Sequence, residues 1–284
     1  MLIFENKLLL IEHLESISDE NSTIGFVPTM GALHNGHLSL IKQSLINDDT
    51  TVLSIFVNPT QFNNPEDLVK YPRTLENDIK KISSVSDKVI VYAPTVEDVY
   101  DGLPYTEHFE FDGLEFQMEG QFRPGHFDGV GTIVKLLFQI VKPTNAYFGE
   151  KDFQQLQIIN KLVEKYKLNV NVVGCPIFRE SNGLAMSSRN ERLSETEKIE
   201  AEFIINTLIK VKVMFLTKEI PVSKISDWVI KTFKKNSNFK LEYFEIADEN
   251  NLIKCIRKNQ NIAFRAFIAV YLNNVRLIDT ISLK

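Results

Sequence analysis

The sequence predicts an α/β protein with a Rossmann-like, doubly wound parallel sheet, followed by a smaller C-terminal α+β domain. Up to about Ile177, short apolar runs rich in β-branched residues alternate with segments of helical period. The strand-like runs are apolar on both faces, which is typical of a parallel sheet covered by helices on both sides. After Arg189 the order changes to helices followed by strands, which indicates a second packing unit.

Proline and turn residues bound the expected elements of the first domain. Pro28 stops the first strand, Asn58 and Pro59 stop the second, and Pro143 ends a long apolar helix. The expected strands are 23–27, 51–57, 88–92, 146–148 and 169–173, and the expected helices are 8–17, 36–47, 130–141 and 152–166.

The second domain is expected to hold two long helices and then three strands. The helices are predicted at 195–216 and 222–235, and the strands at 241–246, 262–272 and 275–281. We place the first domain at 1–180 and the second at 181–284, with the joint between them near 178–192.

Composition excludes several classes of protein. The chain has 284 residues, of which 44% are hydrophobic and 24% charged, as in ordinary globular domains. A net charge of −5 argues against nucleic acid as the main partner, because phosphate neutralisation needs a basic face. The N-terminus lacks the basic region of a signal peptide, and no apolar run has the length of a membrane span, so we expect a cytoplasmic protein. The two cysteines are far apart and are expected to be reduced thiols.

Two histidines three residues apart mark the point where the first strand turns into a helix, in the string TMGALHNGH. Ligands of open α/β sheets bind at the carboxyl ends of strands, so His34 and His37 would face such a ligand from the first helical turn. Free N–H groups and the positive end of the helix dipole attract anions there. Two imidazoles could donate hydrogen bonds to phosphate oxygens, and Gly36 permits close approach. A polar helix start would explain one histidine, but not the whole string.

Two further clusters follow strand ends. Asn58 and Gln61 are neutral amides that can donate and accept hydrogen bonds, although a solvated Asn-Pro turn explains them equally well. Lys151 is placed as a mobile cation for a phosphate, and Asp152 is expected to cap the next helix. Gln155 lies in the first turn of that helix, where a charged helix cap would not require it.

The loop at the domain joint carries a fourth cluster. Ser187, Ser188 and Arg189 bring two hydroxyls, backbone N–H groups and a guanidinium into one short segment, which suits a pyrophosphate. An interdomain linker would explain the preceding Asn-Gly turn, but not this group.

A fifth cluster is a loop that leads into the apolar helix. Arg123 lies in the loop, and Val130, Ile133 and Val134 share one face of the helix. Plain core packing is the simpler interpretation of that face, and an apolar pocket wall is the alternative.

Several strings together carry a resemblance to a known family. They are PTMGALHNGH, NPTQF, YPR at 71–73, FGEKDFQQL and GLAMSSRN, in this order between residues 27 and 190. Together they closely resemble the pantothenate synthetase family, and the chain length also suits it. The H-x-G-H string alone would be less specific, because it recurs across the nucleotidyltransferase superfamily and in class I aminoacyl-tRNA synthetases.

The resemblance implies a reaction in which ATP, pantoate and β-alanine give pantothenate, AMP and pyrophosphate. It implies an enzyme-bound pantoyl adenylate, Mg²⁺ with the ATP, and a homodimer. The C-terminal domain would act as a lid over the site.

The resemblance also implies roles for particular residues. His34, His37, Lys151 and Arg189 would be catalytic, and most of the ATP site would come from three segments of the chain. The implied ATP-binding residues are Met30, Gly31, His34, Gly36, His37, Gly149, Glu150, Lys151, Asp152, Phe178, Met186, Ser187, Ser188 and Arg189. The implied substrate-binding residues are Gln61, Gln155, Asn58, Arg123, Val130, Ile133 and Val134.

Two positions qualify this picture. Asp78 is a candidate magnesium ligand, although we expect it to be a solvated helix charge. Asn182 stands where the family commonly has Asp before Gly-Leu, and a turn accepts either residue.

Other functions remain open from the sequence. Another adenylyl or nucleotidyl transferase of the same superfamily would act on a phosphorylated metabolite, which would need more cations than Gln61 and Gln155 supply. A tRNA synthetase is disfavoured by the acidic charge. A non-catalytic adenine-nucleotide binding protein would not need both glutamines, Lys151 and the Ser-Ser-Arg loop together.

Overall fold

The computed structural model describes residues 1–62 and 65–284. The N-terminal part, residues 1–180, contains these elements in chain order: β1 (Leu2–Phe4), α1 (Lys7–Ile17), β2 (Ile24–Thr29), α2 (Asn35–Asn47), β3 (Thr50–Ile55), η1 (Pro59–Gln61), α3 (Pro65–Lys70), α4 (Leu75–Ser83), β4 (Ile90–Tyr92), α5 (Val96–Tyr100), η2 (Leu114–Phe116), α6 (Met118–Phe122), α7 (His126–Val141), β5 (Asn145–Gly149), η3 (Glu150–Asp152), α8 (Phe153–Tyr166) and β6 (Asn171–Cys175).

Six strands form one parallel sheet in the order β1-β4-β3-β2-β5-β6. The chain builds outward from β2 through β3 to β4, and then returns to place β5 on the other side of β2. The direction of winding therefore reverses at β2. Ligands of open α/β sheets bind in the crevice at such a switch point, outside the carboxyl ends of the strands.

The central strands of this sheet are buried on both faces, as the sequence predicts, whereas the edge strands β1 and β6 are partly exposed. Alternate residues of a strand point to opposite faces, and the neighbours Phe26 and Val27 belong to separate hydrophobic clusters. One cluster packs α1, α7 and α8 against the sheet, and the other packs α2 and the end of α4 against it. The predicted doubly wound parallel fold is confirmed.

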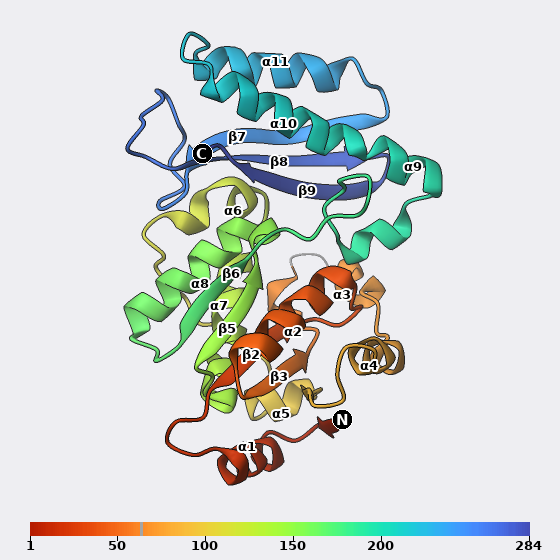
Figure 1. Ribbon diagram of the computed structural model, residues 1–284, viewed down its shortest axis with the longest axis vertical. Coiled ribbons are helices and arrows are strands. Elements are labelled where there is room, and N and C mark those ends of the chain that lie inside the picture. The colour runs from red at the N-terminus through yellow and green to blue at the C-terminus, as the bar shows by residue number, and fades with distance from the viewer. Residues whose placement is uncertain (63–64) are drawn as a thin grey trace.

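The C-terminal part, residues 181–284, has helices on one face of an antiparallel sheet. Its elements are η4 (Ser188–Arg192), α9 (Glu195–Glu200), α10 (Glu202–Leu216), α11 (Val222–Lys234), β7 (Phe239–Asp248), β8 (Phe264–Leu272) and β9 (Val275–Ser282). In Figure 1, α10 and α11 cover the upper face of β7-β8-β9, and the N-terminal part lies below that sheet. One hydrophobic cluster, which runs from Leu184 to Leu283, lies wholly within this part.

Several elements differ from the prediction. The short elements β1, α3, α5 and α6 were not expected. A helix of fewer than two turns, or a strand of three residues, is too short to show a periodic pattern of apolar residues. Helix α4 was missed because its buried face contains a carboxylate, Asp78, beside Ile82. The single helix predicted over 195–216 divides at Ala201, and neither Gly nor Pro marks that point in the sequence. Among the described helices, none has the length and apolarity needed to cross a membrane.

Candidate active site at the carboxyl ends of the strands

An open hollow of about 810 Å³ lies at the carboxyl ends of β2, β3 and β5, where the sheet meets the C-terminal part. A smaller hollow of about 300 Å³ adjoins it, and Lys151, Arg189, Ile278 and Asp279 line both. The larger hollow is lined by Met30, Gln61, Phe62, Tyr71, Glu119, Arg123, His126, Phe127, Lys151, Asp152, Phe153, Gln154, Gln155, Arg189, Tyr243, Phe267, Ile278 and Asp279.

The two histidines of the H-x-G-H string form the cap of α2. His34 is the N-cap residue, and its Nδ1 accepts a hydrogen bond from the backbone N–H of Gly36 at 3.1 Å. The Nδ1 atom of His37 accepts in turn from the backbone N–H of His34 at 3.3 Å. The two rings stack, with their centroids 4.0 Å apart. Each side chain therefore satisfies a helix-start N–H that would otherwise lack a partner.

These contacts fix the protonation of both rings. Burial, reinforced by the neighbouring His37 and Lys151, lowers the pKa of His34 to about 3. Burial and the charge of Lys151 lower the pKa of His37 to about 4. Both imidazoles are therefore neutral at pH 7. Because each Nδ1 accepts a hydrogen bond, the ring proton must be on Nε2, which remains available to donate to an anion.

Gly36 allows the two histidines to approach this closely. A Cβ atom at residue 36 would lie 2.9 Å from both Cε1 and Nδ1 of the His34 ring. A larger residue would push the His34 ring out of its capping position. The spacing H-x-G-H thus has a steric reason in the helix start itself.

Asp78 holds the loop that precedes these histidines. Its carboxylate accepts from the backbone N–H groups of Ala32 at 2.9 Å and Leu33 at 2.7 Å, and from Thr74 Oγ1 at 3.2 Å. The loop needs this support because Gly31 and Ala32 both have positive φ, of 80° and 49°. The expectation of a solvated helix charge is wrong, since Asp78 is fully buried.

Gln61 and its neighbours form the wall beyond β3. Gln61 lines the larger hollow, and its Nε2 donates to the sulfur of Met30 at 2.7 Å. Its backbone carbonyl accepts from His126 Nδ1 at 2.9 Å and from Arg123 at 3.4 Å. Arg123 also lines the hollow, so the structure brings these two predicted residues together.

Asn58 lies beneath this wall. It is 1% exposed, its Nδ2 donates to the carbonyl of Gly129 at 3.1 Å, and its Oδ1 accepts from Tyr100 Oη at 2.6 Å. Its amide also donates to Gln61 Oε1 at 3.3 Å. Asn58 is therefore placed to support Gln61 and is not among the residues that line the hollow.

The turn Gly149–Asp152 follows β5 and carries Lys151. The Lys151 side chain is largely buried, and its Nζ lies 4.0 Å from Asp152 Oδ2. Asp152 occupies the N-cap position of α8 but makes no side-chain capping bond, so the expectation that it caps the helix is wrong. In the first turn of α8, Gln155 lines the hollow, as does Gln154.

The two adjacent glutamines differ in their contacts. Gln154 is 4% exposed, and its Nε2 donates to the carbonyls of Leu114 and Gln117, both at 2.8 Å. Its Oε1 accepts from the backbone N–H of Glu119 at 2.9 Å. The amide of Gln154 thus holds α6 in place, whereas the structure gives Gln155 no such bonds among the described residues.

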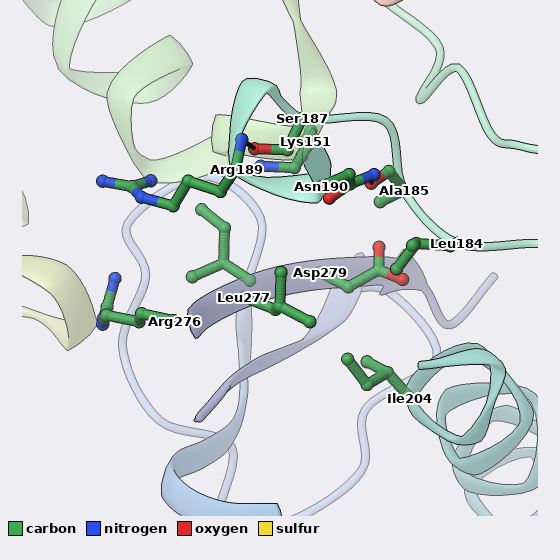
Figure 2. A pocket seen from close by; sticks show the side chains of 11 residues that line it. Lys151, Leu184, Ala185, Ser187, Arg189, Asn190, Ile204, Arg276, Leu277 and Asp279 are labelled. Carbon is green, nitrogen blue, oxygen red and sulfur yellow. Dashed lines mark hydrogen bonds between the residues drawn. The ribbon is translucent and has the colours of Figure 1, made fainter. Parts of the chain in front are cut away.

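The loop at the joint brings the guanidinium of Arg189 and the hydroxyl of Ser187 to the site, next to Lys151 of the turn after β5. Figure 2 shows Lys151, Ser187 and Arg189 side by side above β9, with Asp279 on that strand. Ser187 Oγ accepts from the backbone N–H of Arg189 at 3.2 Å and so caps η4. The backbone N–H of Met186 donates to the carbonyl of Phe178 at 2.9 Å.

The departure at Asn182 has a structural reason. Asn182 Oδ1 accepts from the backbone N–H of Leu184 at 3.1 Å, and its Nδ2 donates to the carbonyl of Lys198 at 2.8 Å. An aspartate could accept the first bond but could not donate the second. Asn182 therefore joins the turn to α9.

The sequence did not single out every residue of the site. Val130, Ile133 and Val134 are 3–5% exposed and lie in the core rather than among the lining residues, whereas Phe127 on the same helix does line the hollow. Further lining residues were not assigned to the site from the sequence: Phe62, Tyr71, Glu119, Phe127, Phe153, Tyr243, Phe267, Ile278 and Asp279. Phe62, Tyr71 and Phe153 lie inside motifs of the chain but were given no role, whereas the last four come from the C-terminal sheet, where no local motif marks them.

The described residues do not form a magnesium site of their own. They include no group of three His, Cys, Asp or Glu side chains that could hold a metal ion. Both oxygens of Asp78 already accept backbone N–H bonds. This donor set fits a metal held mainly by substrate phosphates, which is how Mg²⁺ is commonly bound.

A parallel sheet with its switch point, an H-x-G-H helix start and a cation-lined hollow define a Rossmann-like α/β protein of the nucleotidyltransferase class. The comparisons with known proteins narrow this class. The model of the family described as pantoate-beta-alanine ligase matches residues 3–282. The chain belongs to the pantoate-beta-alanine ligase family, and it is a ligase.

Relatives match over the whole chain. It is 61% identical to a pantothenate synthetase of Flavobacterium psychrophilum and 50% identical to one of Christiangramia forsetii, each covering 100% of both chains. The crystal structure of a pantothenate synthetase from Thermus thermophilus is similar with a TM-score of 0.88 at 33% identity, over 100% of this chain and 99% of that one. The crystal structure of a Francisella tularensis pantoate-beta-alanine ligase, complexed with beta-gamma ATP and beta-alanine, is similar with a TM-score of 0.80 at 37% identity. The match covers 100% of this chain and 98% of that one.

Proposed function

We propose that this chain condenses pantoate with β-alanine at the expense of ATP, through a pantoyl adenylate, and releases AMP and pyrophosphate. The names of its relatives and the ligands of the Francisella structure support this assignment. The observation that carries it is the composition of the hollow. Two neutral amides, Gln61 and Gln155, share it with the cations Lys151 and Arg189, and the H-x-G-H helix start lies at the same strand ends.

The first half-reaction joins two anions. A pantoate carboxylate oxygen attacks the α-phosphorus of ATP, and the bond to the β-phosphate oxygen breaks. Lys151, Arg189 and the N-terminus of α2 supply the positive potential that this step requires. Alignment of the reactants alone can contribute roughly 7–11 kcal/mol in favourable cases.

The histidines act as hydrogen-bond donors. His34 and His37 are neutral in the free protein, with Nε2–H groups that can meet phosphate oxygens. A neutral donor stabilises developing negative charge without giving up its proton. In the second half-reaction the amine of β-alanine attacks the acyl carbon, the bond to the AMP oxygen breaks, and the amine proton is lost to solvent or to a site group.

We propose that Gln61 and Gln155 bind pantoate and that Arg123 acts in the step with β-alanine. A substrate with a hydroxyl and a carboxylate matches two amides better than a second phosphate would, because a phosphate favours cations. This distinguishes the proposal from a transferase that acts on a phosphorylated metabolite. A nucleotide-binding protein without catalysis would bind ATP but release no pyrophosphate.

A rapid-quench experiment tests the proposal. Enzyme mixed with labelled ATP and pantoate, without β-alanine, should release one equivalent of pyrophosphate in a single turnover. Addition of β-alanine should then give pantothenate and AMP. ADP as the product, or no pyrophosphate before β-alanine is added, would contradict the adenylate route.

We further propose that Mg²⁺ enters with ATP, that two chains form a homodimer, and that the enzyme works in the cytoplasm, where ATP is available. Omission of magnesium should stop pyrophosphate release. Analytical ultracentrifugation should give twice the monomer mass, and a monomer at micromolar concentration would contradict the dimer.

A further inference from the structure

Arg265 is a buried arginine on β8 that faces the N-terminal part. It is 5% exposed, and its guanidinium lies over the ring of Phe153 at 4.0 Å. Its Nη2 donates to Glu150 Oε2 at 3.0 Å, and its Nε donates to Glu249 Oε1 at 3.1 Å. Arg265 thus contacts its own part through Glu249 and the N-terminal part through Glu150 and Phe153.

Glu150 belongs to the turn that carries Lys151. It immediately precedes Lys151 in η3, and Phe153 begins the helix that follows. Gly149 and Asp152 provide no side-chain capping bonds to this turn. Across residues 1–62 and 65–284, the pair Glu150–Arg265 is the one ion pair that links the turn to the C-terminal part.

We infer that Arg265 is a positioning residue that fixes the Glu150–Asp152 turn, so that Lys151 is correctly placed only when the C-terminal part is docked. This inference rests on the proposed role of Lys151 at the phosphates of ATP. It assigns to β8 a function in catalysis that does not require Arg265 to touch a substrate.

The contacts of Arg265 can form when the C-terminal part docks and break when it moves away. Hydrogen bonds between a guanidinium and a carboxylate are strong and directional, and stacking on Phe153 fixes the plane of the guanidinium. When the C-terminal part moves away, Arg265 retains Glu249 as a partner. Undocking therefore does not leave an unpaired buried charge, which would be costly.

Two single substitutions separate positioning from general stability. Glu150→Gln removes the charge partner across the interface, and Glu249→Gln removes the partner within the C-terminal part. We expect Glu150→Gln and Arg265→Gln to lower kcat on the order of 10²-fold, the loss typical of a misplacement of about 1 Å. Glu249→Gln should lower kcat much less, and the KM for β-alanine should change little in all three variants.

Arg265→Lys should recover part of the lost kcat, because an ammonium keeps the charge but not the planar fork. Lys254→Gln is the matched control, since Lys254 forms a more exposed pair with Glu245 in the same sheet region. Thermal unfolding of each variant shows that the measured protein is folded. If Arg265→Gln does not fold, Glu150→Gln and Arg265→Lys carry the test.

Combination with Lys151→Ala decides whether Arg265 acts through the lysine. In the Lys151→Ala background, Arg265→Gln should lower the single-turnover rate of pyrophosphate release less than threefold. The same loss in both backgrounds would overturn the inference, as would equal effects of Glu150→Gln and Glu249→Gln. Failure of the proposed function is distinguishable, because the unsubstituted enzyme would then make no pantothenate.

Discussion

At the scale of single residues, burial and hydrogen bonding set the chemistry of the site. His34 and His37 are neutral because they are removed from water beside Lys151, and each Nδ1 is occupied by a backbone N–H. The sequence could locate these residues because they cluster in short motifs at strand ends. It gave no sign that Gln154, beside the predicted Gln155, would hold η2 and α6 through its amide, because those bonds join residues 35 to 40 positions apart.

Lys151 gives the most direct prediction at this scale. Lys151→Ala should lower turnover by about 10²–10³-fold, or roughly 3–4 kcal/mol of transition-state stabilisation, as for loss of one oxyanion donor. Stability should hardly change, because the described Lys151 side chain makes no hydrogen bond within the protein. Steady-state pyrophosphate release measures the effect, and Lys161→Ala is the control, because this lysine of α8 pairs with Asp112 and Glu164 and does not line the hollow. If Lys151→Ala turns over nearly as fast as the unsubstituted enzyme, Lys151 has no catalytic role.

His126 predicts how stability depends on pH. Burial and the charge of Arg123 lower its pKa to about 4, from 6.5 in an unfolded chain. Between pH 6.5 and 4 the unfolded state therefore binds a proton that the folded state does not, so stability falls as pH falls. Protonation of this residue alone should lower the free energy of unfolding by about 2 kcal/mol at pH 5 relative to pH 7.

His126→Gln should therefore flatten the pH dependence by that amount, since an amide can still donate to the carbonyl of Gln61 but does not titrate. Urea unfolding at pH 7 and pH 5 measures it. The exposed His108 has a raised pKa owing to Asp128, so His108→Gln should not flatten the curve in this way. An unchanged slope in His126→Gln would contradict the assignment.

At the scale of elements, the site depends on supports that the sequence does not reveal. The strands and long helices could be predicted because both faces of the sheet are apolar. Helix α4 could not, because its buried contact is a carboxylate that binds a loop 45 residues earlier in the chain. No local pattern distinguishes Asp78 from a solvated acid.

Asp78→Asn tests this support. An amide offers one acceptor in place of two and turns an NH₂ group toward a backbone N–H. Loss of a charged acceptor should lower the free energy of unfolding by roughly 2–3 kcal/mol. It should also weaken ATP binding, because the loop leads directly into His34. Chemical denaturation and calorimetric titration measure the two effects, and Glu76→Gln on the same helix is the control. Full stability with normal ATP binding would show that the loop does not need Asp78.

At the scale of the whole molecule, the site is built between two parts whose cores meet, because Ala247, Leu252 and Phe267 of the C-terminal part pack in the same hydrophobic cluster as α1, α7 and α8. Residues such as Tyr243, Phe267 and Asp279 reach the hollow from the C-terminal sheet. The sequence predicted that this part would act as a lid, but not which residues would hold it, because long-range pairs leave no periodic signal. Besides Arg265, Arg276 of β9 makes a charged contact between the two parts and donates to both oxygens of Glu119 at 2.9 and 2.7 Å.

Arg276 lies between two carboxylates. It also donates to Glu242 at 2.8 Å, and the hydroxyl of Tyr243 donates to Glu119 at 2.7 Å. Burial alone would raise the pKa of Glu119, but its bonds to Arg276 hold that pKa below the usual range. Arg276→Met would leave two largely buried carboxylates facing one another, whereas Glu119→Gln leaves Arg276 paired with Glu242. The first change should therefore loosen the contact between α6 and β9 far more than the second.

We expect loosening of this contact to uncouple ATP consumption from pantothenate formation. A reactive adenylate must be shielded from water until the amine arrives, and we expect the docked C-terminal part to provide this shield. In Arg276→Met, hydrogen exchange in α6 and β9 should quicken. More ATP should be consumed for each pantothenate made, because water then takes adenylate that β-alanine would have used. The ratio of AMP to pantothenate at limiting β-alanine measures this leak, and Glu119→Gln should raise it only slightly. A ratio that stays at one in Arg276→Met, while exchange quickens, would mean that the docked part does not protect the intermediate.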